Sequence, residues 1–301
     1  MSLRDIVSAL GGDLYADGRR ASVPAPGHSA ADRSVSLLVS GGRLIIHGFG
    51  AADWREARAM LLRLGFIDRE GRLTGGGSMD AAVLRPDTRR RRAVAAALWA
   101  GGKPLSGDCL ATRHLRTRAV FAVRDIQSLT FHPEAPVSVY RETSTLRPAL
   151  MARILGPRDD PVGVELTSLE SNGLRAVGLR LSRKTIGAAP TGSAIRLYPA
   201  AAEMLAGEGV FTTLSASRRF QTPGWALMSA GNLANWTPPP GVRSVLVAGD
   251  RGKAGEAASA RLTARLEAGG LKARILLPDP PFGDWNEVAV AEMLGREREG
   301  R

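Results

Sequence analysis

The sequence predicts α+β N-terminal and middle regions followed by a C-terminal α/β domain with a mainly parallel sheet. Two observations predict this fold class. Short β-type runs recur in the first two thirds of the chain, and two of them are joined by a glycine turn, which is typical of antiparallel sheets. From Glu203 onward, β-type and helix-type segments alternate, which is typical of a parallel sheet with helices on its faces. With 301 residues, of which 44% are hydrophobic, the chain is large and apolar enough to bury such cores.

The first predicted unit, residues 1–67, is a small ββα module. Ser34–Val39 and Arg43–Gly48 have the composition of two strands, and the glycines between them supply a turn. Asp53 is the expected cap of a helix over Trp54–Leu64, in which apolar residues recur at helical spacing. The glycine-rich segment that follows, residues 68–88, is predicted to be a flexible linker.

Residues 89–196 are predicted to form a basic, mainly antiparallel α+β subdomain. Four arginines lead into a helix that ends at Gly101-Gly102, and a second helix is expected over about Cys109–Arg118. The expected strands are Ala149–Leu155, Val162–Thr167 and Ala194–Leu197, with the basic pair Arg183-Lys184 between the last two.

Residues 197–301 are the predicted α/β domain. Its expected elements are, in order, strand Met204–Ala206, helix Phe211–Arg218, strands Trp225–Met228 and Val242–Ala248, helix Gly255–Ala268 and strand Ala273–Leu277.

The net charge of +12 favours a polyanionic partner, and nucleic acid is the first class to consider. The segment from Arg85 to Asp125 carries ten Lys or Arg residues against three Asp, more than half of the net charge. Such a concentration suits a phosphate-facing surface. A compositional bias toward arginine, or ordinary solvated helix faces, would also account for this charge.

A single cysteine, Cys109, excludes a disulfide framework within the chain and a cysteine-based zinc site. His114 lies five positions later, but a structural thiol is the expected role of Cys109. No apolar run approaches the length of a membrane span, and the first residues lack the apolar stretch of a signal peptide. We therefore expect a cytoplasmic protein with no membrane partner.

Carboxylates follow two strands of the predicted parallel sheet. Glu208 comes after Met204–Ala206, and Asp250 comes after Val242–Ala248, each beside glycine. Open α/β sheets bind ligands at the carboxyl ends of their strands, so these two side chains are expected to converge, with Asp284 as a third member. Clustered carboxylates favour a hard cation such as Mg²⁺. Unrelated loop and capping acids are the alternative.

Three segments resemble the motifs of the Toprim family: Glu208–Leu214 its glutamate motif, Gly224–Leu233 the strand and turn that follow, and Ala248–Gly255 its Asp-x-Asp loop. Most of the chain is similar to the Toprim primase-like proteins of phages, plasmids and integrated elements. Within that likeness, Val23–Trp54 is similar to a degenerate primase-type zinc-ribbon region, and Arg180–Leu197 is similar to the segment before the Toprim domain.

The resemblance implies roles for individual residues. Glu208, Asp250 and Asp284 would be both the catalytic residues and the ligands of Mg²⁺ or Mn²⁺. Lys184 would contact nucleotide or template phosphates, and the basic region would guide single-stranded DNA. The residues that we expect to bind nucleic acid or nucleotide are Arg89, Arg90, Arg91, Arg92, Arg183, Lys184, Arg251 and Lys253. Nucleotides and a replicative helicase are further candidate partners.

The sequence departs from this family both in its Toprim motifs and in its N-terminal region. Gly252 replaces the second aspartate of the Asp-x-Asp loop, so one expected metal ligand is missing, and Phe211 replaces a second glutamate. Structural zinc takes four Cys or His ligands, whereas the N-terminal region retains only His28 and His47. We therefore predict no bound zinc and a weakened site for Mg²⁺ or Mn²⁺.

Three functions remain compatible with the sequence. The first is a primase-like DNA-replication protein that binds single-stranded DNA and, if it is active, catalyses metal-dependent nucleotidyl transfer. The second is a catalytically weakened nucleic-acid-binding accessory protein, which Gly252 favours. The third is a Toprim nuclease, in which the same carboxylates activate water.

Overall fold

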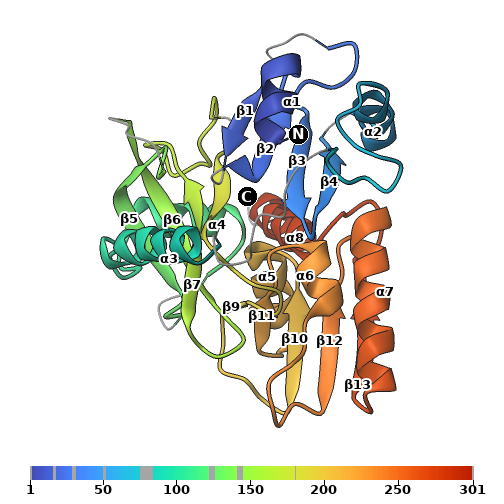
Figure 1. Ribbon diagram of the computed structural model, residues 1–301. Coiled ribbons are helices and arrows are strands. Elements are labelled where there is room, and N and C mark those ends of the chain that lie inside the picture. Colours follow the sequence, from blue (N-terminus) through green and yellow to red (C-terminus); the bar gives the residue numbers. More distant parts are fainter. Residues whose placement is uncertain are drawn as a thin grey trace. The chain divides into compact units, whose positions relative to one another are not determined.

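The computed structural model describes residues 2–15, 18–28, 32–49, 52–74, 84–121, 126–140, 145–179 and 181–299 (Figure 1). The chain divides into two compact units, Met1–Asp87 and Thr88–Arg301, which are described separately. The predicted fold class is confirmed: two antiparallel sheets with helices precede a mixed, mostly parallel C-terminal sheet. None of the described helices combines the length and the apolar character that crossing a bilayer requires.

The first unit contains a four-stranded antiparallel sheet in the order β1-β2-β3-β4. The strands are β1 (Asp13–Tyr15), β2 (Arg20–Val23), β3 (Val35–Ser40) and β4 (Arg43–Gly48), and the helices are α1 (Leu3–Leu10) and α2 (Trp54–Arg63). The predicted hairpin is β3 and β4. Gly41 and Gly42 form its turn with φ of 56° and 74°, a conformation that glycine adopts without strain.

The helix that was predicted after Asp53 is α2, and the aspartate is its cap. The Asp53 carboxylate accepts a hydrogen bond from the backbone amide of Arg55 at 2.7 Å. Ala57 and Leu61 of this helix are fully buried in a core that α1, β2 and β3 share. The sequence analysis did not predict α1, β1 or β2, because these elements are three to eight residues long and carry little periodic signal.

Both ends of the predicted linker, residues 68–88, belong to folded parts of the chain. Arg72 bridges to Arg43 of β4, and the amide of Leu44 donates to the carbonyl of Gly71 at 2.7 Å, so the start of the segment packs on the first unit. Leu84 already begins α3 (Leu84–Ala100). Residues 75–83, which include the glycine run, lie outside the described residues. The four-part domain division itself stays a prediction.

The second unit begins with an antiparallel sheet in the order β5-β6-β7-β8, here called the middle sheet. Its strands are β5 (Leu129–Pro136), β6 (Leu146–Leu155), β7 (Pro161–Ser168) and β8 (Arg183–Gly187), and α3 and α4 (Leu110–Thr117) accompany it. Two of the predicted strands correspond to β6 and β7. The sequence analysis missed β5, which a proline and a β-bulge between His132 and Ala135 interrupt, and it missed β8, whose first residues are the predicted basic pair.

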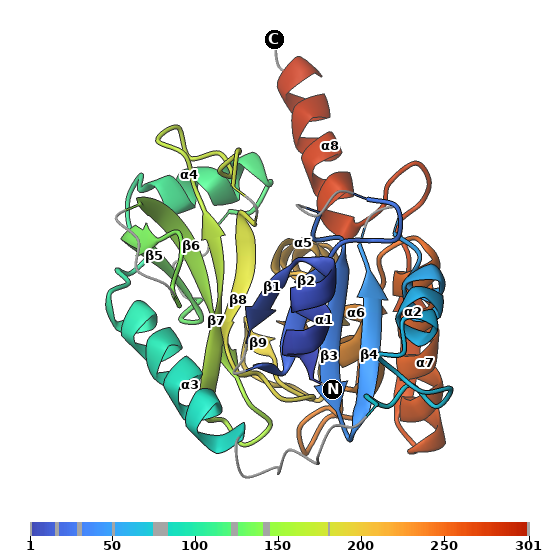
Figure 2. The same cartoon turned by 45° about the horizontal axis from the view of Figure 1, so that its top comes forward.

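The two faces of the middle sheet have different neighbours. Ala95 and Leu98 of α3 pack on one face, against Met151, Val164 and Leu166 (Figure 2). The opposite face packs in a second cluster with α4 and with residues of the C-terminal sheet and its helix α5; its members include Leu115, Leu150, Ile154, Ile195, Leu197, Val210 and Leu214. This second cluster, the shared core, joins the middle sheet to the C-terminal sheet within one unit.

The C-terminal sheet has the strand order β13-β12-β10-β11-β9. Its strands are β9 (Ile195–Arg196), β10 (Glu203–Gly207), β11 (Gly224–Ala226), β12 (Ser244–Ala248) and β13 (Lys272–Leu276), and its helices are α5 (Val210–Phe220), α6 (Ala230–Asn235), α7 (Lys253–Ala268) and α8 (Trp285–Glu299). Strands β10 to β13 pair in parallel, as predicted, whereas β9 is antiparallel to β11. Strand β9 was predicted in the middle region, but it pairs in this sheet.

Helices cover both faces of the C-terminal sheet, as a parallel sheet requires. Leu233 of α6 and Leu262 of α7 pack on the face that carries Met204 and Val247. Ala216 of α5, with Trp285 and Val288 of α8, packs on the face that carries Leu205 and Ala248. The sequence analysis did not predict α6 or α8.

His114 on α4 is a buried base that makes the fold sensitive to acid. Its Nδ1 donates a hydrogen bond to the carbonyl of Gly173 at 3.1 Å, and its ring lies edge-on to Phe211. Burial, together with the positive charges of Arg118 and Arg175, lowers the pKa of His114 to about 4. As the pH falls, His114 therefore takes up a proton near pH 6.5 in the unfolded chain but only near pH 4 in the folded chain.

We expect the fold to have its full stability above pH 6.5. As the pH falls to about 4, protonation of His114 in the unfolded chain should lower the unfolding free energy by roughly 3 kcal/mol. His114→Gln retains a donor for the Gly173 carbonyl and does not titrate. Urea unfolding at pH 7.5 and pH 4.5 should show a smaller loss of stability for the variant than for the wild type. Equal losses would mean that His114 does not cause the acid sensitivity.

Candidate active site at the carboxyl edge of the parallel sheet

Three acidic side chains leave the C-terminal sheet at its carboxyl edge. Strands β10 and β12 are neighbours, with Gly207 opposite Ala248, so Glu208 and Asp250 follow the two strands at the same edge. Strand β13 pairs with β12 and leads into the loop that ends at Asp284. We call Glu208, Asp250 and Asp284 the acidic cluster; the connectivity that predicted their convergence is the connectivity observed.

Backbone hydrogen bonds hold the loops of the acidic cluster together. The amide of Arg251 donates to the carbonyl of Gly283 at 2.7 Å, which ties the Asp250 loop to the Asp284 loop. One carboxylate oxygen of Asp284 accepts from the amides of Asn286 and Glu287, at 2.7 and 2.8 Å, and so caps the first turn of α8. These bonds fix the backbone of two of the three acids.

The electrostatics of the acidic cluster differ from those of surface carboxylates. Burial, together with the charges of Asp284 and Glu208, raises the pKa of Asp250 to about 7. Burial also raises the pKa of Glu208. The positive charge of Arg183 on β8 lowers the pKa of both Glu208 and Asp250 and so opposes these shifts. Without a bound cation, Asp250 is therefore only partly ionised near neutral pH.

The residues of the acidic cluster fit a hard cation. Oδ1 of Asp250 is buried and has no hydrogen-bond partner among the described residues, although the side chain is also hydrogen-bonded to Thr212. A buried carboxylate oxygen without a donor is stabilised by a positive charge. Across the described residues, no three His, Cys, Asp or Glu side chains already stand as a finished ligand set.

Gly252 leaves a gap on one side of Asp250. Its φ is 109°, a conformation that L-residues rarely adopt, and a Cβ built there meets open space. Two neighbouring acids that could replace the missing aspartate are otherwise engaged: Glu256 accepts from the amide of Gly252 at 3.1 Å, and Glu287 accepts from the amide of Gly283 at 2.7 Å. A third, Glu203, lies at the opposite end of β10 from Glu208.

The predicted basic pair on β8 points in two directions. Alternate residues of a strand face opposite sides of its sheet. Arg183 pairs with Thr167 on the opposite face, and its charge acts on Glu208 and Asp250, whereas Lys184 pairs with Leu166, whose side chain lies in the core beneath α3. The Lys184 ammonium donates to the carbonyl of Val137 at 2.6 Å, and burial lowers its pKa. Arg183 is therefore better placed than Lys184 to meet a phosphate at the acidic cluster.

The four arginines of α3 do not reach the acidic cluster, because α3 covers the other face of the middle sheet (Figure 2). Arg92 pairs with Asp160 at 2.9 Å, and the guanidinium of Arg91 lies over the ring of Tyr140. Arg89 and Arg90 are exposed. The sequence could predict the charge of this segment but not the side of the sheet on which it lies.

Arg251 and Lys253 flank the gap at Gly252. The Arg251 Nε donates to the carbonyl of Pro278 at 2.6 Å, so this side chain is bound to the neighbouring loop. Lys253 is exposed at the first turn of α7. In the first unit, described separately, His28 pairs with Asp32 at 3.2 Å and His47 lies against the ring of Phe49. The absence of zinc stays a prediction.

Sequence reasoning missed two residues that shape the site. Thr212 lies one helical turn after Glu208, at the start of α5, and it is hydrogen-bonded to Asp250. Asn286 is fully buried and donates from Nδ2 to the carbonyl of Arg118 at 2.6 Å and to Ser215 Oγ at 3.0 Å. It fixes the start of α8, which Asp284 caps.

Comparison with known proteins bears on the second unit. Residues 203–293 match the Toprim domain model, and residues 89–197 match a domain of unknown function, DUF7146. No curated protein matches the sequence. Among solved structures, the Aquifex aeolicus primase (zinc-binding and RNA polymerase domains) is 14% identical, with 98% of this chain and 82% of that chain covered and a TM-score of 0.46.

Two further solved structures are similar over part of this chain. The primase fragment of the bacteriophage T7 primase-helicase is 13% identical, with 66% of this chain and 73% of that chain covered and a TM-score of 0.38. The DnaG primase catalytic domain bound to single-stranded DNA is 14% identical, with 71% and 82% covered and a TM-score of 0.46. The residues that match the Toprim domain model, 203–293, contain the whole acidic cluster and the four parallel strands β10 to β13 that carry it.

Proposed function

We propose that this chain is a primase-like protein, of the type found in phages, plasmids and integrated elements, that binds single-stranded DNA and joins nucleotides with the help of Mg²⁺ or Mn²⁺. One observation carries the proposal. Asp250 is a half-buried acid beside Glu208 and Asp284 with a pKa of about 7, and its buried Oδ1 has no donor among the residues that the structure describes. Such a cluster is stabilised by a hard cation.

Glu208, Asp250 and Asp284 would hold the cation. When bound, Mg²⁺ or Mn²⁺ neutralises phosphate charge and favours attack by a hydroxyl group at phosphorus. The other residues of the site balance the charge of the acids and hold their side chains in place. Arg183 supplies the positive charge opposite the acids and would hold a phosphate of the nucleotide or of the DNA. The Asp284 carboxylate is held in place by the amides of α8.

A second candidate function is a nucleic-acid-binding accessory protein without catalytic activity. Gly252 favours it, because this position offers a metal no side-chain oxygen and the nearby acids Glu256 and Glu287 are engaged with backbone amides. In that case, the acidic cluster and Arg183 would be the remains of a catalytic site, and affinity for DNA would not depend on metal.

The test is an incubation of purified protein with single-stranded DNA and labelled nucleotides, in Mg²⁺, in Mn²⁺ and in EDTA, with DNA binding measured on the same samples. Metal-dependent extension products support the polymerising function. DNA binding without products in any metal supports the accessory function. Shortened DNA without extension supports a nuclease.

The two residues of the basic pair give a matched test of the DNA surface. Arg183→Gln should weaken binding of single-stranded DNA about tenfold at low salt and make the salt dependence less steep, because one phosphate contact is lost. Lys184→Gln, next to it in β8, should leave the affinity nearly unchanged and lower stability instead, because its ammonium is bonded within the protein. Fluorescence anisotropy over a salt series checks both. Equal effects of the two variants on affinity would contradict the assignment.

A further inference from the structure

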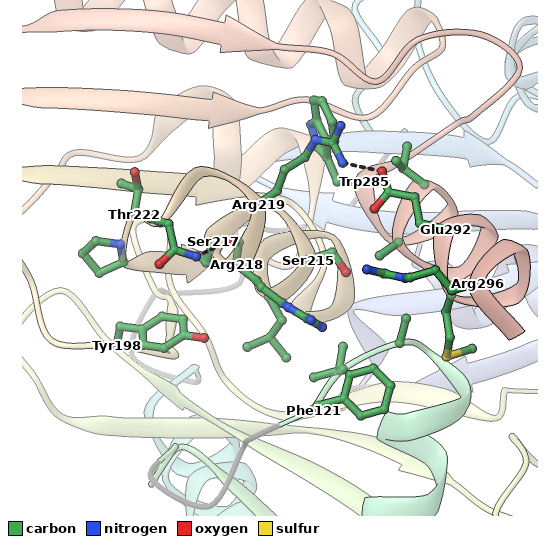
Figure 3. A pocket seen from close by; sticks show the side chains of 18 residues that line it. Phe121, Tyr198, Ser215, Ser217, Arg218, Arg219, Thr222, Trp285, Glu292 and Arg296 are labelled. Atoms are coloured by element: carbon green, nitrogen blue, oxygen red, sulfur yellow. Dashed lines mark hydrogen bonds and ion pairs between the residues drawn. The ribbon is translucent and has the colours of Figure 1, made fainter. Parts of the chain in front are cut away.

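A second site lies at the other end of α5, away from the acidic cluster. A cavity of about 1080 Å³ opens between the C-terminal half of α5, helix α8 and the segment Ala119–Phe121 (Figure 3). The N-terminal turn of α5 carries Thr212 beside Asp250, whereas the cavity is lined by later residues of the helix, from Leu214 onward. Neither Glu208 nor Asp250 lines the cavity.

Two arginines from different helices extend into this cavity. Arg218 comes from the last turn of α5 and Arg296 from α8, and Figure 3 shows both side chains directed into the same space. Arg219 is ion-paired with Glu292 at 2.6 Å, but within the described part of the unit neither Arg218 nor Arg296 is paired with a carboxylate. The charged side chains that line the cavity therefore give it a net positive charge.

Helix stability alone explains only part of this arrangement. Cations in the last turn of a helix are favourable, which accounts for Arg218 and Arg219 on α5. That role does not require Arg218 to share a cavity with an arginine of another helix. Two guanidinium groups around one space match the oxygens of an anionic group such as a phosphate or a carboxylate.

The cavity also offers an aromatic surface. Phe121 is 46% exposed at its wall, and the guanidinium carbon of Arg218 lies 5.6 Å from the centre of its ring. Leu214 and Val288 add apolar surface beside it. An exposed phenylalanine next to two guanidinium groups provides a stacking surface for a planar base and an anchor for its phosphates.

We propose that this cavity binds a free nucleoside triphosphate, with the base against Phe121 and the phosphates on Arg218 and Arg296. The cavity volume is of the order of a single small-molecule site, which favours one nucleotide over an extended strand. The proposal goes beyond the function proposed above and does not depend on it. Its arginines supply the charge that a cation supplies in the acidic cluster, so binding here does not require metal.

The test is isothermal titration calorimetry in EDTA, with ATP, adenosine and inorganic tripolyphosphate as separate probes. ATP should bind saturably, and each of the other two should bind at least tenfold more weakly, because each meets only half of the site. Arg218→Ala combined with Arg296→Ala should weaken ATP at least tenfold. Phe121→Ala should weaken ATP several-fold and leave tripolyphosphate unchanged. Arg274→Ala, an exposed arginine on β13, is the matched control and should have no effect.

Three results would overturn the proposal. The first is the absence of saturable ATP binding to the wild-type protein at millimolar concentration, a result that can be obtained without any variant. The second is tripolyphosphate that binds as tightly as ATP, with no effect of Phe121→Ala, which would indicate an anion site without base recognition. The third is a short oligonucleotide that displaces ATP at lower concentration than ATP itself requires, which would indicate a strand-binding site. None of these results bears on extension products, which report on the acidic cluster.

Discussion

Replacing Glu208 by glutamine should reduce metal-dependent nucleotide incorporation by about 100- to 1000-fold while DNA affinity stays within a few-fold of the wild type. Glutamine has the size and shape of glutamate but no charge, so the variant removes a metal ligand without opening a cavity. Because burial already raises the pKa of Glu208, the neutral side chain should also raise the thermal midpoint of the metal-free protein.

Glu203→Gln is the matched control for this experiment. Glu203 is the first residue of the same strand, β10, and is exposed at the end opposite to the carboxyl edge. It should show wild-type incorporation and no gain in thermal midpoint. If both variants retained full product, or if both lost it equally, the acidic cluster would not be the catalytic site.

Gly252→Asp should raise affinity for Mn²⁺ about tenfold, because it places a carboxylate beside Asp250, where the Toprim loop has its second aspartate. A Cβ at this position meets open space, so the side chain fits without a clash. The backbone is unfavourable, since φ is 109°, and the strain should cost about 1–3 kcal/mol of unfolding free energy.

Gly252→Ala separates the two effects of this substitution. It carries the same backbone strain and no carboxylate, so it should lose stability as the aspartate variant does and gain no affinity for metal. Calorimetric titration with Mn²⁺ and thermal unfolding with and without Mn²⁺ check both quantities. Equal metal affinity in the aspartate and alanine variants would mean that position 252 does not face the cation.

The order of elements predicted the acidic cluster, because a parallel sheet determines which loops meet at its carboxyl edge. That Glu208 and Asp250 lie at the same edge is readable from the alternation of strands and helices, whereas the structure shows that their strands are neighbours. The same reasoning could not place Arg89 to Arg92, because charge does not indicate which face of a sheet a helix covers. The sequence analysis expected both Arg183 and Lys184 to bind nucleic acid, and the family resemblance gave Lys184 the phosphate contact, since β8 was not predicted and its alternation was therefore unknown.

Strand β9 shows a second limit of the sequence. Ala194–Leu197 was predicted as a strand, and Ile195–Arg196 is one, but its partner is β11 in the C-terminal sheet. Two residues carry too little pattern to specify a partner. The polar side chains Thr212 and Asn286 were missed for a related reason: their importance comes from Asp250, Arg118 and Ser215, which are distant in the sequence.

The shared core has a consequence for how this protein can be divided. One family match ends at residue 197 and the other begins at residue 203, as they would for two separable domains. Yet Leu115 and Ile154 from one side of that border pack with Val210 and Leu214 from the other, and Asn286 is bonded to the carbonyl of Arg118. A fragment cut at this border would expose half of a hydrophobic core. Recombination that exchanged one of these regions would therefore have to supply a matching face for the other.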